Sequence, residues 1–242
     1  MQSARTSVAA VSPPQLVVFD LAGTTVEDHG NVAGFLIEAM ALSGHMVTLA
    51  EANAVMGEPK PVAIAQLLSA RIGPVTKDHE RVKATHLEFL RRMNHYYATS
   101  SAIREMPGTS RVFQALRARG IKVVCDTGFE RSTVEALLGR LGWRERGLVD
   151  DVVPSDEVAR GRPAPDLIFE AMRRVGVTEA SRVAKIGDTP SDLGEGHSAG
   201  CGWVIGTTYG SHRADQLEPH HPTHIIDRIE DLLPILLDGA TA

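Results

Sequence analysis

The chain has 242 residues, of which 43% are hydrophobic, enough for one large domain or for a core with a smaller companion. Its formal net charge is -5 and it has no basic block, which argues against a nucleic-acid partner. No apolar run approaches the roughly 18 residues of a membrane-spanning helix, so no membrane association is expected. Residues 1–14 carry no signal-peptide pattern and are expected to form a mobile tail. The cysteines, Cys125 and Cys201, lie far apart in the sequence, which favours reduced thiols and a cytoplasmic protein.

The first predicted element is a short strand over residues 16–19, LVVF, whose continuous apolar run is typical of a strand buried on both faces. It ends at Asp20, and a turn over residues 23–25, Gly-Thr-Thr, follows it. Such a turn can present backbone N–H groups to an anion. A strand-to-helix turn with a capping aspartate and no ligand would have the same sequence pattern. Residues 28–103 then show helical periodicity alone, with helices expected over 31–44, 49–56, 61–72 and 76–99.

From Pro107 onward, predicted helices and strands alternate. Helices are expected over residues 109–119, 131–141, 165–175, 191–199 and 229–237, and strands over 121–125, 148–153, 183–186, 203–205 and 224–226. This alternation predicts an α/β protein with a Rossmann-like parallel sheet and helices on both faces. The core is expected to comprise residues 15–27 and 104–242. Residues 28–103 would then be an inserted α-helical cap over the carboxyl edge of the sheet.

Polar residues follow three of the predicted strands, namely Asp20, the pair Asp126-Thr127, and Asp188, and an Arg-Pro loop supplies Arg162. In a parallel sheet these strand ends meet at one edge, where open α/β sheets bind ligands. Two carboxylates and a backbone carbonyl suit Mg²⁺, and a hydroxyl next to glycine together with an arginine suits a phosphoryl group. The combination predicts phosphoryl transfer to an aspartate.

The segments DLAGTT, DTG, GRP and GDTPSD, from Val17 to about Gly206, resemble the four motifs of the haloacid dehalogenase (HAD) superfamily. The resemblance implies that the first aspartate of the first motif is the nucleophile and that Mg²⁺ is the cofactor. It also implies a small phosphate or phosphonate substrate and a possible homodimer. The implied roles are the following: nucleophile, Asp20; metal ligands, Asp20, the carbonyl of Ala22 and Asp188; metal support, Asp192; phosphoryl binding, Gly23, Thr24, Thr127, Gly128 and Arg162, the last in place of the usual lysine.

Ala22 departs from the pattern of most phosphatases of this superfamily, which carry a general-acid aspartate at that position. Losing a general acid typically costs about 10²–10⁴-fold in rate, so a leaving group activated in another way is expected. Met56-Gly57-Glu58-Pro59-Lys60 and the run GRPAP at residues 161–165 resemble the phosphonatase branch, which also has alanine at the position of Ala22. The resemblance implies that Lys60 forms a Schiff base with an aldehyde substrate and that the C–P bond then breaks. A position at the start of a helix would help to lower the pKa of Lys60.

Two positions depart from the phosphonatase pattern. Ala63 replaces a histidine three residues after the lysine, and Leu21 replaces a tryptophan after the nucleophile. The substrate could therefore be phosphonoacetaldehyde or a related phosphonate. Two alternatives stay open: a HAD-type phosphatase or phosphotransferase that acts without a Schiff base, and a non-catalytic partner-binding protein on the same fold.

Overall fold

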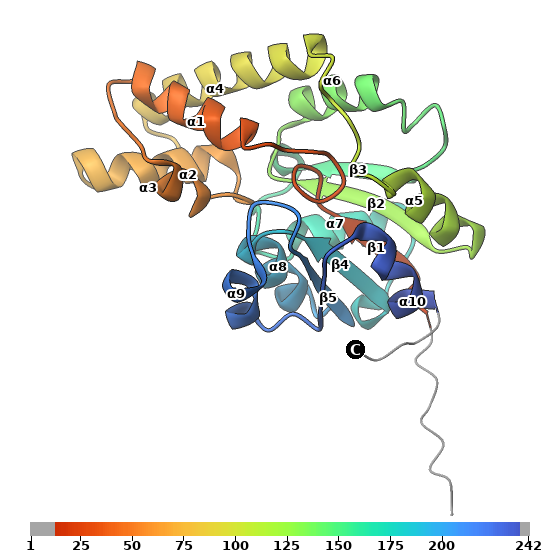
Figure 1. Ribbon diagram of the computed structural model, residues 1–242. Helices are drawn as coiled ribbons and strands as arrows, with labels where there is room; N and C mark the ends of the chain where they lie inside the picture. Colours follow the sequence, from red (N-terminus) through yellow and green to blue (C-terminus); the bar gives the residue numbers. More distant parts are fainter. Residues whose placement is uncertain (1–12, 238–242) are drawn as a thin grey trace, which may run out of the picture.

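A computed structural model describes residues 13–237, so the expected tail lies outside the described residues except for Pro13 and Pro14. The core is one sheet of six parallel strands in the order β3-β2-β1-β4-β5-β6 (Figure 1). The strands are β1 (Leu16–Phe19), β2 (Lys122–Thr127), β3 (Asp151–Pro154), β4 (Val183–Gly187), β5 (Trp203–Thr207) and β6 (His224–Ile226). β1 lies at the centre, as expected for its wholly apolar sequence.

Helices cover both faces of this sheet. They are α5 (Thr109–Ala118), α6 (Arg131–Leu141), α7 (Asp166–Val175), α8 (Pro190–Ala199), α9 (Ala214–Leu217) and α10 (Leu232–Leu237). Alternate residues of β1 face opposite layers, since Phe19 packs on Phe113 of α5 while Val18 lies in the cluster that includes Leu167 of α7. The predicted fold, a parallel sheet with helices on both faces, is confirmed.

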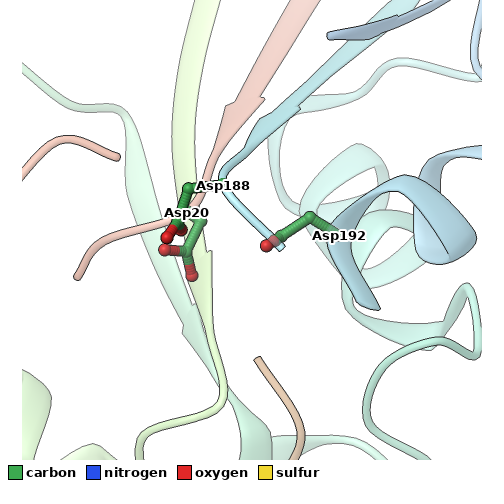
Figure 2. A group of neighbouring side chains, drawn as sticks. All are labelled: Asp20, Asp188 and Asp192. Carbon is green, nitrogen blue, oxygen red and sulfur yellow. The ribbon is translucent and has the colours of Figure 1, made fainter. Parts of the chain in front are cut away.

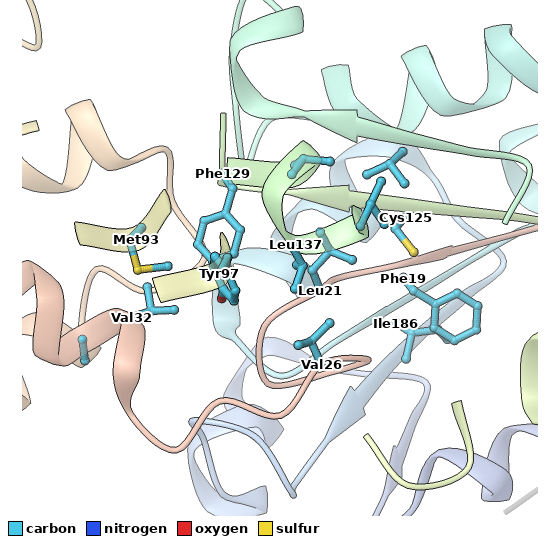
Figure 3. Packing of buried hydrophobic residues seen from close by; sticks show 14 of the residues in the cluster. Phe19, Leu21, Val26, Val32, Met93, Tyr97, Cys125, Phe129, Leu137 and Ile186 are labelled. Atoms are coloured by element: carbon cyan, nitrogen blue, oxygen red, sulfur yellow. The ribbon is translucent and has the colours of Figure 1, made fainter. Parts of the chain in front are cut away.

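Four helices occupy the chain between β1 and α5: α1 (Asn31–Leu42), α2 (Leu49–Asn53), α3 (Lys60–Ile72) and α4 (Glu80–Thr99). We call residues 28–103 the helical insert; its helices lie together in Figure 1, apart from α8, α9 and α10. Figure 3 shows that its apolar residues join those of the core in one cluster, in which the rings of Tyr97 and Phe129 are 5.9 Å apart. Asn94 of α4 also accepts a hydrogen bond of 2.6 Å from Thr133 of α6.

Some predicted boundaries are wrong. The third strand begins at Asp151 rather than at residue 148, because the N–H of Leu148 closes a turn on the carbonyl of Trp143 instead of joining the sheet. The long helix begins at Glu80 rather than at residue 76, because His79 caps it by accepting from the N–H of Arg81. Within residues 13–237, no helix combines the length and the apolar character required to cross a membrane.

Candidate active site

Three carboxylates meet at the carboxyl edge of the sheet (Figure 2). Asp20 directly follows β1, Asp188 directly follows β4, and Asp192 lies in the first turn of α8. One oxygen from each residue lies within 4.8 Å of the others, and all three side chains are buried. The parallel register explains this meeting, since Phe19 pairs with Ile186 and the two strands therefore end at the same level.

Crowding of these buried negative charges changes their titration. Burial raises the pKa of Asp20 to about 7; the carboxylates of Asp192 and Asp188 add to this effect, while Arg162 opposes it. Burial and Asp192 likewise raise the pKa of Asp188 to about 6. Hard oxygen ligands whose negative charge is only partly neutralised fit a divalent cation such as Mg²⁺. The residues present therefore suit the metal that the sequence predicted.

The surroundings fix the carboxylate of Asp188. Its Oδ1 accepts a hydrogen bond of 3.2 Å from the Thr24 hydroxyl, and its Oδ2 accepts from the N–H and the hydroxyl of Ser211, both at 2.6 Å. Gly23 has a φ of +92°, and a Cβ at that position would lie 2.6 Å from Oδ2 of Asp188. The structure thus places Gly23 and Thr24 against Asp188 and outside the lining of the cavity described below.

Arg162 is buried and contacts four carboxylates. Its Nη1 donates to Asp20 at 2.6 Å and lies 2.9 Å from Asp192, its Nε donates to Glu195 at 3.0 Å, and its Nη2 pairs with Asp126. A rigid fork of this kind can present a fixed positive charge beside the oxygens of a phosphoryl group.

Lys185 is a second buried cation that the sequence analysis did not identify. It lies on β4 and is fully buried, with its Nζ paired to Asp126, 2.9 Å from Glu195 and 3.2 Å from Asp192. A lysine inside the apolar strand Val183–Gly187 could have indicated a buried ion pair, because a buried ammonium requires a buried partner of opposite charge. Burial works against its charged form, yet the carboxylates around it hold the pKa of Lys185 above its ordinary value.

A second group of acidic side chains, Asp126, Asp192 and Glu195, also lies close enough together to hold a metal. Lys185 and Arg162 already neutralise it through direct contacts. We therefore assign this group to the support of Arg162 and keep the Asp20–Asp188 pair as the candidate metal site.

A cavity of about 40 Å³ lies between the helical insert and the core, with room for only a few water molecules. Asp20, Ala22 and Arg162 line it from the core, and Asp28 and Lys60 line it from the insert. The remaining lining residues are Val32, Met56, Gly57, Thr127, Gly128, Phe129, Thr189 and Ser211. The predicted nucleophile, the predicted Schiff-base lysine and the predicted phosphate-binding Thr127 and Gly128 thus share one small space.

Lys60 is the first residue of α3 and is only 4% exposed. Burial is the main cause that lowers the pKa of Lys60, to about 8; Arg162 acts in the same direction, while Asp20, Glu58 and Asp28 oppose it. About a tenth of Lys60 is therefore neutral at pH 7, against roughly one part in 2,500 for an ordinary lysine.

The insert and the core approach each other closely at Gly128. A Cβ at this position would lie 2.8 Å from the carbonyl oxygen of Glu58, two residues before Lys60. Because that oxygen belongs to the backbone, it cannot rotate away as a flexible side chain would. Because Gly128 has no side chain, the segment that carries Lys60 can pack directly against the loop that follows β2.

A third titratable group from the insert lies near Lys60. His86 of α4 has its Nε2 3.3 Å from Glu130, and burial together with the charge of Lys60 lowers the pKa of this histidine to about 4. It lies outside the cavity lining. The proximity of His86 to Lys60 could not be predicted from local sequence, because it arises from the packing of α3 against α4.

Comparisons with known proteins place these features in a family. Phosphonoacetaldehyde hydrolase of Bordetella pertussis is 28% identical over 261 residues, covering 94% of this chain and 92% of that protein. The solved phosphonoacetaldehyde hydrolase-like protein of Oleispira antarctica is 25% identical, with a TM-score of 0.81, covering 98% of this chain and 96% of that one. A structure described as a predicted phosphoglycolate phosphatase, from Haemophilus somnus, is 22% identical with a TM-score of 0.70, covering 91% and 97%.

The family model of haloacid dehalogenase-like hydrolases matches residues 14–200, most of the chain. This match agrees with the resemblance drawn from the four motifs and with the observed sheet. It also decides against the non-catalytic alternative. The chain therefore belongs to the haloacid dehalogenase-like hydrolases and is an enzyme of that family.

Proposed function

We propose that this enzyme is an Mg²⁺-dependent hydrolase that cleaves the C–P bond of phosphonoacetaldehyde or of a related phosphonate aldehyde. The observation that carries the proposal is the shared cavity, in which buried Lys60 and Asp20 face the same space and Ala22 stands where a phosphatase would carry its general acid. The similarity to phosphonoacetaldehyde hydrolases over nearly the whole chain supports the same proposed function.

Asp20 is the proposed nucleophile. Its carboxylate attacks phosphorus to give an aspartyl-phosphate, and water later releases phosphate. Arg162, which already donates to Asp20, would neutralise the phosphoryl oxygens, and Thr127 and Gly128 would bind them. Mg²⁺, held by Asp20, the carbonyl of Ala22 and Asp188 with Asp192 in support, would supply further charge neutralisation.

Lys60 is proposed to activate the carbon side. Neutral Lys60 forms an imine with the aldehyde, and the protonated imine accepts the electron pair of the breaking C–P bond to become an enamine. This leaving group needs no proton from the position of Ala22. The low pKa of Lys60 fits the requirement, since only the neutral amine attacks a carbonyl.

The test measures phosphate release from phosphonoacetaldehyde with Mg²⁺ in the wild type and in Lys60→Arg, which keeps the positive charge but cannot form the imine. Release that falls by at least about 10³-fold in the variant supports the proposal. Removal of Mg²⁺ by a chelator should abolish release as well. Equal release by both proteins would contradict the Schiff base.

A phosphatase that acts without a Schiff base is the second candidate function. The structure from Haemophilus somnus has the same fold, and this likeness shows only that the fold is compatible with a phosphatase. It predicts turnover of small phosphate esters that Lys60→Arg leaves largely intact. The same pair of proteins, assayed on phosphoglycolate, therefore separates the two candidates.

A further inference from the structure

We propose that Asp28 is the proton-transfer residue for imine formation and imine hydrolysis at Lys60. This inference rests on the proposed Schiff-base function and names the group that completes it. Asp28 lies in the segment that leads from β1 to α1, and it lines the same cavity as Lys60.

Four titratable residues line this cavity among those that the structure describes: Asp20, Asp28, Lys60 and Arg162. Asp20 attacks phosphorus, Lys60 attacks the carbonyl carbon, and a guanidinium keeps its protons at all relevant pH values. Asp28 alone is left to carry a proton on the carbon side, where Ala63 offers no titratable group.

The geometry of Asp28 suits this task. Its Oδ1 accepts hydrogen bonds from the N–H groups of Asn31, at 2.7 Å, and Val32, at 3.3 Å, which fix the carboxyl group at the start of α1. Within residues 13–237 its Oδ2 accepts no such bond and is available to a ligand in the cavity. Burial raises the pKa of Asp28, although the two N–H groups and Lys60 oppose this, so its protonated form persists to a higher pH than that of an exposed aspartate.

The proton balance closes over one turnover. In the carbinolamine, the C–O bond breaks, the Asp28 carboxyl gives its proton to the departing hydroxyl, which leaves as water, and the nitrogen lone pair forms the C=N bond. Asp28 is then a carboxylate in the same cavity as the new iminium cation, and the two opposite charges attract each other. After C–P cleavage the enamine takes up a proton from solvent at its carbon to give the product iminium. When water then adds to this iminium, the Asp28 carboxylate takes a proton from that water and returns to its acid form.

The experiment follows imine formation directly, with acetaldehyde as the probe and cyanoborohydride as the trap. The readout is the rate of mass gain on Lys60, and Lys60→Arg should gain none. Asp28→Asn keeps the two hydrogen bonds to α1, since asparagine caps helices as well as aspartate does, but it cannot transfer a proton. We expect trapping to slow by about 10²-fold in Asp28→Asn. The control, Glu27→Gln, removes a neighbouring carboxylate outside the cavity lining and should match the wild type.

A second variant separates proton transfer from a structural role. Asp28→Gly opens space in the cavity, and added formate should restore its trapping rate, which a structural defect would not allow. Asp28→Asn that traps at the wild-type rate would overturn the role of Asp28 while the Schiff base stands. No Lys60 adduct in the wild type would overturn the Schiff base and the role of Asp28 together.

Discussion

Replacement of Lys185 by methionine would test whether the buried charge cluster behind Arg162 is a stabilising feature. The substitution keeps the length of the side chain and removes its charge. At an effective dielectric constant of 20, the 3.2 Å contact of Nζ with Asp192 corresponds to about 5 kcal/mol before desolvation is counted. Loss of one partner of a buried pair typically costs about 3–5 kcal/mol, and we expect the free energy of unfolding to fall by that amount.

The loss should depend on pH because Glu195 can take up a proton. Burial, together with the charge of Asp126, raises the folded-state pKa of Glu195 above its unfolded value. A raised folded-state pKa gives stability that is fully present below the unfolded pKa and is lost as the pH rises through the folded pKa. Without Lys185 this folded pKa rises further above the wild-type value of about 8, so the deficit of the variant should stay constant below about pH 7 and grow between about pH 7 and pH 9.

Urea unfolding at both pH values measures the effect. Lys122→Met is the matched control, since Lys122 is also a lysine on a strand of the sheet and also pairs with an aspartate, Asp150, but is exposed. A surface pair of this kind contributes less than about 1 kcal/mol. A loss for Lys185→Met no larger than that of the control, or one that does not change with pH, would refute the reasoning.

Three further results are expected. Gly128→Ala should lower kcat/KM for phosphonoacetaldehyde by at least about tenfold in steady-state kinetics, because the new Cβ would clash with the backbone of Glu58. The control Gly139→Ala, with nothing within 4 Å of its Cβ, should leave kcat/KM unchanged. Acylation of Lys60 by acetic anhydride, which needs the neutral amine and no proton donor, should rise about tenfold between pH 7 and pH 9, because the Lys60 pKa of about 8 sets the neutral fraction; a flat profile would contradict this. Added Mg²⁺ should raise the Tm of the wild type but not of Asp188→Ala, as followed by calorimetry.

The architecture and the strand-end residues could be predicted because they depend on local patterns. The apolar run of β1 and the alternation of helices and strands define a parallel sheet, and its topology brings Asp20 and Asp188 to one edge. Lys185 was missed since its partners, Asp126 and Glu195, come from other elements and only the strand register brings them together. Asp28 was missed for a similar reason, as only the folding of the insert brings the segment before α1 and the start of α3 to the same cavity.

The burial of Lys60 has a consequence for the selectivity of the enzyme toward free aldehydes. The walls that keep water from its amine belong partly to the insert and partly to the core. Any motion that separates these parts to admit a substrate also rehydrates Lys60 and returns its pKa toward the ordinary value. The amine of the proposed Schiff-base lysine is therefore more often protonated, and reacts more slowly with free aldehydes, while the cavity is open. Its reactivity rises when the cavity closes again around a molecule held by the proposed phosphoryl-binding groups.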